Sequence, residues 1–544
     1  MKKLFLFLSF VVAFLIQGTA AAKEKVLRPK LVVGLIVDQM RWDYLYRYFD
    51  RYGETGFKRV LNEGFSCENT MINYVPTITS VGHASVYTGS VPAIHGITGN
   101  SFVLAATGQK LNCVGDESVR PLGTENPSCR RSPRNLLVTT MTDELRLATN
   151  FRGKSIGIAL KDRAAILPAG HAANAAYWFD SKIGCWVSSS YYMDKLPDWV
   201  EGYNRTDPAA CLLAEGWNTL YPIETYTAST VDKKAYEVPI AKEVGSSFPY
   251  DTAEMMKKQG KGVISNTPFA NVMTMQMAKL AVKNEELGKD DDTDFLAVSF
   301  SSPDVLGHLM GVNAVEMEDM YLRLDKELGD FFTFLDEEIG KGNYTLFLTA
   351  DHAGPHHVDF LREHKLPGKE WDEKRTKNML DSLILARFHI SEVVKSIANY
   401  QVFLNCDKIP AHSELFTQVK ACVVSFLQEC EEIAYAVDCE RVSSVTMPQT
   451  IRERIVNGYN PQRSGDVQII LKPGWYSGAF GRTNHGVWCA YDSHIPLLFM
   501  GWGVAKGRTC REVHVTDIAA TVAALLKIQM PSGCVGVPVT EVIK

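Results

Sequence analysis

Short apolar runs that are typical of buried strands alternate along this chain with stretches that are typical of helices. The strand-like runs are Leu31–Val37, Ser155–Leu160, Phe295–Phe300, Tyr344–Ala350, Val467–Leu471 and Pro496–Met500. The helix-like stretches that separate several of them are Asn135–Thr149, Ala270–Lys283 and Glu316–Leu335. Buried strands that alternate with helices indicate a parallel sheet covered on both faces. We therefore predict an α/β fold with a mostly parallel central sheet flanked by helices.

Two long regions interrupt this alternation. Residues from about 165 to 265 are rich in Tyr, Trp, Asn and Gly, and residues from about 366 to 480 have a helical pattern of their own at Glu414–Ile433. The chain has 544 residues, which is more than one compact core usually holds. We predict that both regions are cap-like insertions flanking the site, within one catalytic domain that spans residues 23–544.

The first 22 residues have the pattern of a secretory signal peptide. Lys2 and Lys3 precede the apolar stretch Leu4–Ile16, and small residues follow as far as Ala20–Ala22, near which we expect cleavage. The apolar stretch is short for a membrane span, no other long one follows it, and no Cys follows it to carry a lipid. We therefore expect an exported protein without a stable membrane anchor.

Charge and cysteine content exclude two kinds of binding site. The 57 basic and 62 acidic residues give a formal net charge of −5, and no long basic run is present, which argues against nucleic-acid binding. The twelve cysteines fit an exported protein with some disulfides, and Cys113 with Cys129 and Cys185 with Cys211 are near enough to pair. Because the chain has no Cys-x-x-Cys pair, a thiolate zinc site is disfavoured.

Polar side chains follow four of the strand-like runs. Asp38, Lys161, Asp304 and Asp351 each stand just beyond the end of one run. In open α/β sheets the chemistry lies beyond the carboxyl ends of the strands. We therefore expect these four side chains to meet at one site.

Three Asp and three His residues, five of them at or near these positions and one in a distant loop, form a candidate metal-ligand set. They are Asp38, Asp304, His308, Asp351, His352 and His485. Asp304 and His308 share a face if the segment is helical, and a carboxylate with imidazoles favours zinc over magnesium. Each pair alone also fits a solvated Asp and a packed His. Together they are enough for two zinc ions with an open position on each. His356 and His357 follow closely, and we expect them to lie outside the metal shell or at the surface.

A candidate nucleophile lies in the segment Pro76–Ser85. Hydroxyl side chains open an apolar, small-residue helix there, and a helix N-terminus favours an anion. A zinc ion can hold such a hydroxyl in its ionised form. An ordinary helix cap is the alternative interpretation, and spacing does not separate Thr77, Thr79 and Ser80.

Two further positions offer groups that bind phosphoryl oxygens. Lys161 and Arg163 are two residues apart, and their cations suit the oxygens of a dianionic phosphoryl group. Asn100 is able to donate an amide hydrogen bond to the same oxygens, although a turn Asn is the ordinary interpretation.

In their order along the chain these motifs resemble the alkaline phosphatase superfamily, and more narrowly the phosphate-irrepressible bacterial enzymes that use a Thr nucleophile. The motifs are Asp38–Arg41, Thr77–Ser85, Gly96–Asn100, Lys161–Arg163, Asp304 with His308, Asp351-His352 and His485-Gly486, and the resemblance runs from about residue 30 to 525. It implies that Asp304, His308 and His485 hold one zinc ion and that Asp38, Asp351 and His352 hold the other. It also implies that Thr79 is the nucleophile bridging to the second ion, and that Asn100, Lys161 and Arg163 bind the transferred phosphoryl group.

We therefore predict a two-zinc phosphomonoesterase, periplasmic or secreted from a bacterium, that hydrolyses small phosphate monoesters at alkaline pH through a phospho-threonine intermediate. We expect a monomer. The alternative is a phosphodiesterase or nucleotide pyrophosphatase on the same metals, but the two cations of Lys161 and Arg163 match a dianionic monoester. A sulfatase would need a Cys/Ser-x-Pro-x-Arg motif, export argues against a phosphoglycerate mutase, and the filled positions argue against an inactive binding protein.

Overall fold

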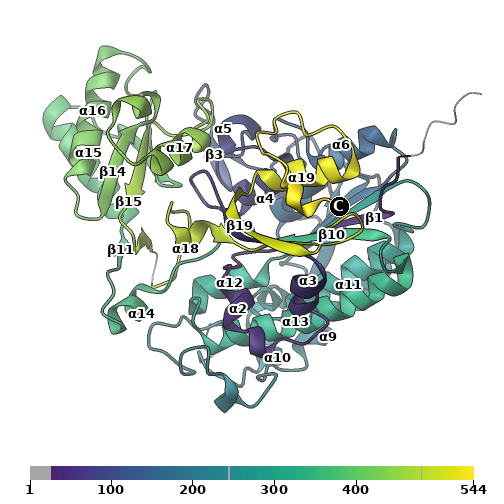
Figure 1. The fold of residues 1–544 in the computed structure, drawn as a ribbon. Helices are drawn as coiled ribbons and strands as arrows, with labels where there is room; N and C mark the ends of the chain where they lie inside the picture. The colour runs from purple at the N-terminus through teal and green to yellow at the C-terminus, as the bar shows by residue number, and fades with distance from the viewer. Residues whose placement is uncertain (1–25, 243–244, 479–480) are drawn as a thin grey trace, which may run out of the picture.

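A central sheet of 11 strands organises the computed structural model, which describes residues 26–242, 245–478 and 481–544 (Figure 1). Its middle consists of parallel strands in the order β10 (Tyr344–Thr349), β1 (Leu31–Val37), β9 (Asp294–Phe300), β6 (Ser155–Ala159) and β7 (Ala175–Asp180). Antiparallel neighbours extend both sides, namely β18 (Leu497–Gly501), β2 (Phe65–Met71) and β17 (His494–Ile495) beyond β10, and β8 (Cys185–Ser189) and β5 (Pro121–Leu122) beyond β7. Strand β19 (Gly507–His514) pairs with β2. The predicted α/β fold with a mostly parallel central sheet is confirmed.

Helices cover both faces of this sheet, as the complete burial of β1, β9 and β10 requires (Figure 1). On one face lie α4 (Thr79–Thr88), α6 (Met141–Ala148), α7 (Asp162–Ala169) and α19 (Asp517–Leu526). On the other lie α3 (Phe57–Glu63), α11 (Phe269–Asn284), α12 (Ser302–Met310) and α13 (Val315–Leu335). The three predicted helical stretches correspond to α6, α11 and α13. Helix α6 begins later than predicted because Thr140 caps it, with Asp143 closing a capping box.

The region from about 366 to 480 builds a second, smaller sheet with its own apolar core (Figure 1). Its four strands are β12 (Val394–Ala398), β13 (Gln401–Leu404), β15 (Val467–Leu471) and β14 (Ile433–Asp438). Helices α15 (Glu373–Phe388), α16 (Glu414–Gln428) and α17 (Gln449–Gly458) pack around it. The assignment of Val467–Leu471 to the central sheet was wrong, because its partners are β13 and β14. A mostly apolar five-residue run predicts a buried strand but not the strand beside it.

Part of the predicted cap region between about 165 and 265 belongs to the central sheet, since it contains β7 and β8. The rest forms short helices, α8 (Asp198–Arg205), α9 (Pro208–Leu213) and α10 (Thr252–Gln259), of which α9 packs on α11.

The expectation of disulfides was wrong, because all twelve cysteines lie in the described residues and all are free thiols. Cys113 and Cys129 are instead buried in one apolar cluster. The predicted signal peptide lies outside the described residues. Among the described helices, none combines the length and the apolar character that a bilayer span needs.

Candidate active site

Parallel pairing brings four predicted site residues to one end of the sheet. Asp38 directly follows β1, and its backbone N–H donates to the carbonyl of Phe300 at the end of β9, 3.0 Å away. Lys161 caps α7 just beyond β6, Asp304 lies in the first turn of α12 after β9, and Asp351 comes shortly after β10. Because β10, β1, β9 and β6 are adjacent, these side chains share one site, as the strand-end pattern predicted.

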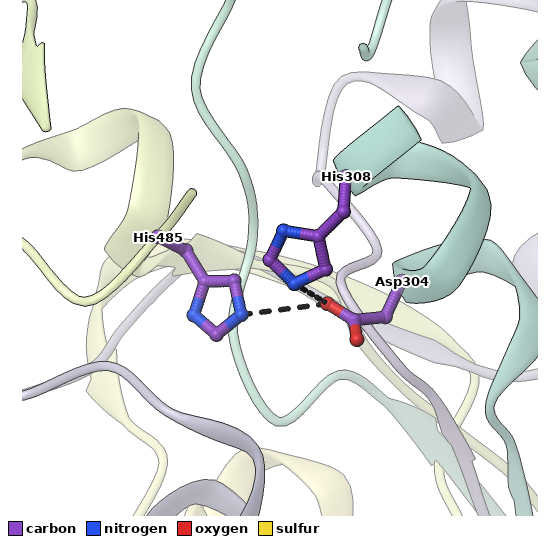
Figure 2. Close-up of side chains that lie close together, drawn as sticks. All are labelled: Asp304, His308 and His485. Carbon is purple, nitrogen blue, oxygen red and sulfur yellow. Dashed lines mark ion pairs between the residues drawn. The ribbon is translucent and has the colours of Figure 1, made fainter. Parts of the chain in front are cut away.

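The first candidate metal group consists of Asp304, His308 and His485 (Figure 2). Oδ1 of Asp304 lies 3.2 Å from Nε2 of His308 and 3.4 Å from Nε2 of His485. The Nδ1 atoms of these two rings lie 2.7 Å from the carbonyl oxygens of Thr483 and Thr77 respectively. A ring nitrogen that donates to a carbonyl leaves Nε2 as the free acceptor, which is the arrangement of a metal-binding histidine.

Electrostatics within the first group favour an ionised carboxylate. Burial raises the pKa of Asp304, but the positive charges of Lys161 and His308 outweigh burial and hold this pKa well below its usual value. Burial conversely lowers the pKa of His308, and Asp304 outweighs that effect and raises it. The carboxylate is therefore available as a ligand at neutral pH.

The second candidate group surrounds Nε2 of His352. This atom lies 3.5 Å from Oδ1 of Asp38 and 3.5 Å from Oδ2 of Asp351. Nδ1 of His352 lies 3.0 Å from the carbonyl of Ala353. As in the first group, Nδ1 therefore faces a carbonyl and Nε2 is left as the acceptor. Oδ2 of Asp351 also lies 3.2 Å from Nδ1 of His83. Burial lowers the pKa of His352 to about 3, so its ring is neutral and able to bind a metal.

The two groups adjoin each other. The rings of His352 and His485 stack with their centroids 3.6 Å apart. Ligand atoms of Asp38, Asp304 and His352 lie within 4.8 Å of one another, so Asp304 reaches toward both groups. The structure therefore brings together all six predicted metal ligands.

Charge and hydrogen bonding at the site both fit divalent metal ions. Asp38, Asp304 and Asp351 are all buried, and Lys161 contributes one positive charge, with Nζ 2.6 Å from Asp38 and 2.5 Å from Asp304. Burial, followed by the neighbouring carboxylates, raises the pKa of Asp38 well above its usual value. Oδ1 of Asp38, Oδ2 of Asp351 and Nε2 of His352 are buried without a hydrogen-bond partner. Buried, unpaired donor atoms of this N/O type suit zinc.

The structure distinguishes the three candidate nucleophiles. Thr79 is the first residue of α4, and its buried Oγ1 lies 3.5 Å from Nζ of Lys161. The hydroxyl of Thr77 donates instead to the carbonyl of Val487, 3.1 Å away. The hydroxyl of Ser80 is buried and forms no hydrogen bond with a described residue. Thr79 is therefore the hydroxyl that faces the carboxylate and lysine cluster.

The three predicted phosphoryl-binding residues are placed differently. Lys161 lies within the cluster. Arg163 is in the first turn of α7, where its Nη1 lies 3.7 Å from Oδ1 of Asp162 and its Nε is buried without a partner. Oδ1 of Asn100 accepts from the backbone N–H of Ser80 at 3.2 Å, which leaves its NH₂ group available. Within the described residues, neither Arg163 nor Asn100 forms a hydrogen bond or an ion pair with the carboxylates of the candidate metal groups.

Gln39 is a site residue that sequence reasoning missed. Its Nε2 donates to Oδ1 of Asp304 at 2.8 Å, and its backbone N–H donates to Oδ1 of Asp351 at 3.2 Å. It therefore links both metal groups, with a positive φ of 64° that is uncommon for such a residue. A Cβ at Gly307 would lie 2.9 Å from Cδ of Gln39, which explains the glycine between Asp304 and His308. Its position next to Asp38 was the only signal in the sequence.

Asp492 is a second missed residue, and it joins three segments of the site. Its buried Oδ2 accepts from the backbone N–H groups of Gly486 at 2.9 Å and Val487 at 3.0 Å, just after His485. The same oxygen lies 3.5 Å from the hydroxyl of Thr77. Its backbone carbonyl accepts from Ala353, which follows His352. No sequence motif points to Asp492.

His356 and His357 belong to neither candidate group within the described residues. Nδ1 of His356 lies 2.6 Å from Oδ1 of Asn313. Nε2 of His357 lies 2.9 Å from the carbonyl of Gly481, and its ring stacks on Tyr236 with centroids 4.6 Å apart. These histidines therefore support the loops around the site.

Comparisons with known proteins agree with this geometry. The family model of the type I phosphodiesterase / nucleotide pyrophosphatase family matches residues 32–488. The chain is 48% identical over 519 residues to the alkaline phosphatase PafA of Elizabethkingia meningoseptica, covering 95% of each chain. It is 50% identical over 521 residues to the alkaline phosphatase PhoV of Synechococcus elongatus, covering 96% of this chain and 94% of the relative. A protein of Myroides odoratus named a calcium-transporting ATPase is 51% identical over 527 residues, covering 96% of each.

Solved structures give the same relationship. The crystal structure of wild-type PafA matches with a TM-score of 0.93 at 47% identity, covering 96% of this chain and 100% of that chain. A PafA mutant in which one Thr, one Asn, one Lys and one Arg are replaced also matches with a TM-score of 0.93, at 46% identity. The chain therefore belongs to the type I phosphodiesterase / nucleotide pyrophosphatase family and groups there with the alkaline phosphatases, which confirms the resemblance carried by its motifs.

Proposed function

We propose that this protein is an exported alkaline phosphatase that hydrolyses phosphate monoesters at two zinc ions through a phosphothreonine formed on Thr79. Its enzyme class follows from about 50% identity to two alkaline phosphatases over nearly the whole chain. The observation that carries the chemistry is the contact of Lys161 with Asp38, Asp304 and the Thr79 hydroxyl. This contact supports a proposal in which a cation, metal-ligand carboxylates and a nucleophile act together in one buried cluster.

The six ligands divide into two sets in this proposal. Asp304, His308 and His485 would hold one zinc ion, and Asp38, Asp351 and His352 would hold the other. Bound zinc would supply Lewis-acid chemistry, which lowers the pKa of a hydroxyl nucleophile and neutralises charge on a leaving oxygen. The orphaned atoms of Asp38, Asp351 and His352 support this assignment.

Thr79 performs the transfer in two steps. Its Oγ1 attacks phosphorus in line, so that a P–Oγ bond forms while the ester P–O bond breaks and the alcohol departs. Water then attacks the phosphothreonine, the P–Oγ bond breaks, and inorganic phosphate leaves as Thr79 regains its proton. The backbone N–H groups at the start of α4 favour the anionic groups involved.

Lys161, Arg163 and Asn100 bind the non-bridging phosphoryl oxygens in this proposal. Two cations and an amide donor match a dianionic monoester better than a monoanionic diester. The unpaired Nε of Arg163 and the available NH₂ group of Asn100 support this role. The charge balance therefore favours monoesters over the diesters from which the family takes its name.

The test compares kcat/KM of zinc-loaded enzyme on p-nitrophenyl phosphate and on bis(p-nitrophenyl) phosphate. We expect a strong preference for the monoester. Replacing Lys161 or Arg163 by Met should lower monoester kcat/KM by about 10- to 100-fold, since a charged hydrogen bond contributes ~1.5–3 kcal/mol, with a smaller effect on the diester. A preference for the diester in the unaltered enzyme would contradict the proposed substrate class.

Export and a monomeric state complete the proposal. Export rests on the composition of residues 1–22, and cell fractionation with N-terminal sequencing of the mature protein tests it. Recovery of the enzyme in the cytoplasm with an intact N-terminus would contradict export. Light scattering on the purified enzyme tests the monomer.

A further inference from the structure

A cavity of about 370 Å³ opens beside the first metal group, with His308 in its wall. Val305 and Leu309 of α12 line it, and the loop residues Arg482 and Asn484 contribute polar groups. Asn266, from the region between residues 165 and 265, also lines it. Arg482, Asn484 and Asn266 belong to neither candidate metal group.

The loop that carries Arg482 is fixed onto α12. The backbone N–H of Thr483 donates to the carbonyl of His308 at 3.2 Å, and its hydroxyl donates to the carbonyl of Gly307 at 2.6 Å. Nδ1 of His308 donates back to the carbonyl of Thr483. On the other side of Arg482, the carbonyl oxygen of Gly481 lies 2.9 Å from Nε2 of His357. The backbone on both sides of Arg482 is therefore anchored, and the cavity wall is preformed.

Two polar side chains on this wall, Arg482 and Asn484, offer donors that have no partner among the described residues. Arg482 is exposed and makes no hydrogen bond or ion pair with any residue that the structure describes. Oδ1 of Asn484 accepts from the backbone N–H of His485 at 3.0 Å, which leaves its NH₂ group unused. A guanidinium and an amide NH₂ beside each other suit a carboxylate or a phosphate. The apolar side of the cavity, Val305 and Leu309, suits a short carbon chain.

We propose that this cavity receives the alcohol part of the substrate and that Arg482, with Asn484, selects alcohols carrying a second anionic group. The inference rests on the proposed function, in which Thr79 attacks from the side of Asp38 and His352. In-line transfer then places the leaving oxygen on the opposite side, toward Asp304 and His308. The cavity begins at His308, so the departing alcohol extends into it. Arg482 is accordingly a specificity-determining residue that acts on the leaving group.

The test uses three series of substrates with two to four carbons. They are ω-carboxyalkyl phosphates, α,ω-alkyl bisphosphates and, as the uncharged comparison, ω-hydroxyalkyl phosphates. We expect the unaltered enzyme to prefer the carboxylate and bisphosphate over the hydroxyl compound of equal length. Arg482→Gln should lower kcat/KM for the anionic substrates by about two- to fivefold, as for an exposed ion pair, and leave the hydroxyl series unchanged. Arg482→Lys should retain most of the preference, and the carboxylate and bisphosphate arms show which anion is favoured.

Lys506→Gln is the matched control, because it removes one exposed positive charge near the start of β19, at the opposite end of the sheet from the site. It should leave unchanged the ratio of kcat/KM for the anionic substrates to kcat/KM for the hydroxyl substrates. An equal loss in Lys506→Gln would assign the preference to overall charge, and an unchanged ratio in Arg482→Gln would remove the role of Arg482; either result overturns the inference. Competitive inhibition of p-nitrophenyl phosphate hydrolysis by the same alkyl compounds gives a second readout. Turnover of none of the monoesters would overturn the proposed function itself.

Discussion

Replacing Gly82 by alanine should damage this enzyme, although the same change stabilises most helices. Gly82 lies in α4, three residues after Thr79, where the helix packs directly against Asp351. A Cβ at position 82 would lie 2.6 Å from Cβ of Asp351, whereas apolar atoms pack at ~3.5–4.0 Å. Helix and loop must therefore separate by about 1 Å. Neither can yield cheaply, because the contact is with backbone and Cβ atoms and not with the end of a flexible side chain.

The size of the effect follows from these contacts. Overpacking costs ~1–3 kcal/mol, and the higher helix propensity of alanine returns ~0.5–1 kcal/mol, so a net destabilisation remains. The separation also moves Thr79 away from the proposed metal ligands Asp351 and His352. A displacement of ~1 Å can cost about 100-fold in rate. We expect Gly82→Ala to lower kcat by that order and to lower the unfolding temperature.

The assay measures kcat on p-nitrophenyl phosphate and thermal unfolding of the zinc-loaded protein. Gly202→Ala in α8 is the control, since the nearest atom to its Cβ would be Nη2 of Arg205 at 3.7 Å, an ordinary contact. That variant should be slightly stabilised and fully active. The reasoning is refuted if Gly82→Ala matches the unaltered enzyme in both kcat and unfolding temperature.

Three further predictions concern metals, pH and site geometry. Chelation should lower the unfolding temperature, because the three ligand carboxylates are buried together, and added zinc should restore it; an unchanged temperature in differential scanning fluorimetry would speak against a metal site. Burial, with smaller effects from Glu237 and Asp232, raises the pKa of Glu316 to about 8, so the free energy of unfolding should fall as pH rises from ~4.3, the usual Glu pKa, to about 8. Thermal unfolding between pH 5 and 9 should show a smaller fall in Glu316→Gln, a variant that keeps the acceptor for Tyr250. Parallel curves for the variant and the unaltered enzyme would contradict the assignment. Asp492→Ala should weaken zinc binding by about 10- to 100-fold, as for other residues that orient metal ligands. Competition with a chelating dye measures this affinity, and an unaltered value would show that the loop carrying His485 does not need Asp492.

The part of the site that sequence predicted is the part that depends on strand ends. Asp38, Asp304 and Asp351 each follow a run of buried residues, and adjacent parallel strands present their carboxyl ends at one edge. Local pattern is then enough to place them together. His485 follows no such run, and its grouping with Asp304 and His308 came from the family resemblance.

The rest depends on contacts that local pattern does not contain. The backbone of Gln39 donates to Asp351, which is 312 residues away, and Asp492 reaches Thr77 across 415 residues. The partner of Val467–Leu471 was likewise unpredictable, because pairing depends on distant strands. Cysteines close in sequence suggested disulfides, but burial in apolar clusters accounts for Cys113 and Cys129 as free thiols.

The most direct test of the central claim is identification of the phosphorylated residue. Zinc-loaded enzyme turning over a monoester is quenched in acid, digested, and the peptide containing the first turn of α4 is sequenced by mass spectrometry. The account predicts one phosphate on Thr79, lost in Thr79→Ala. Phosphate on Thr77 or Ser80 instead, or full turnover by Thr79→Ala, would contradict it.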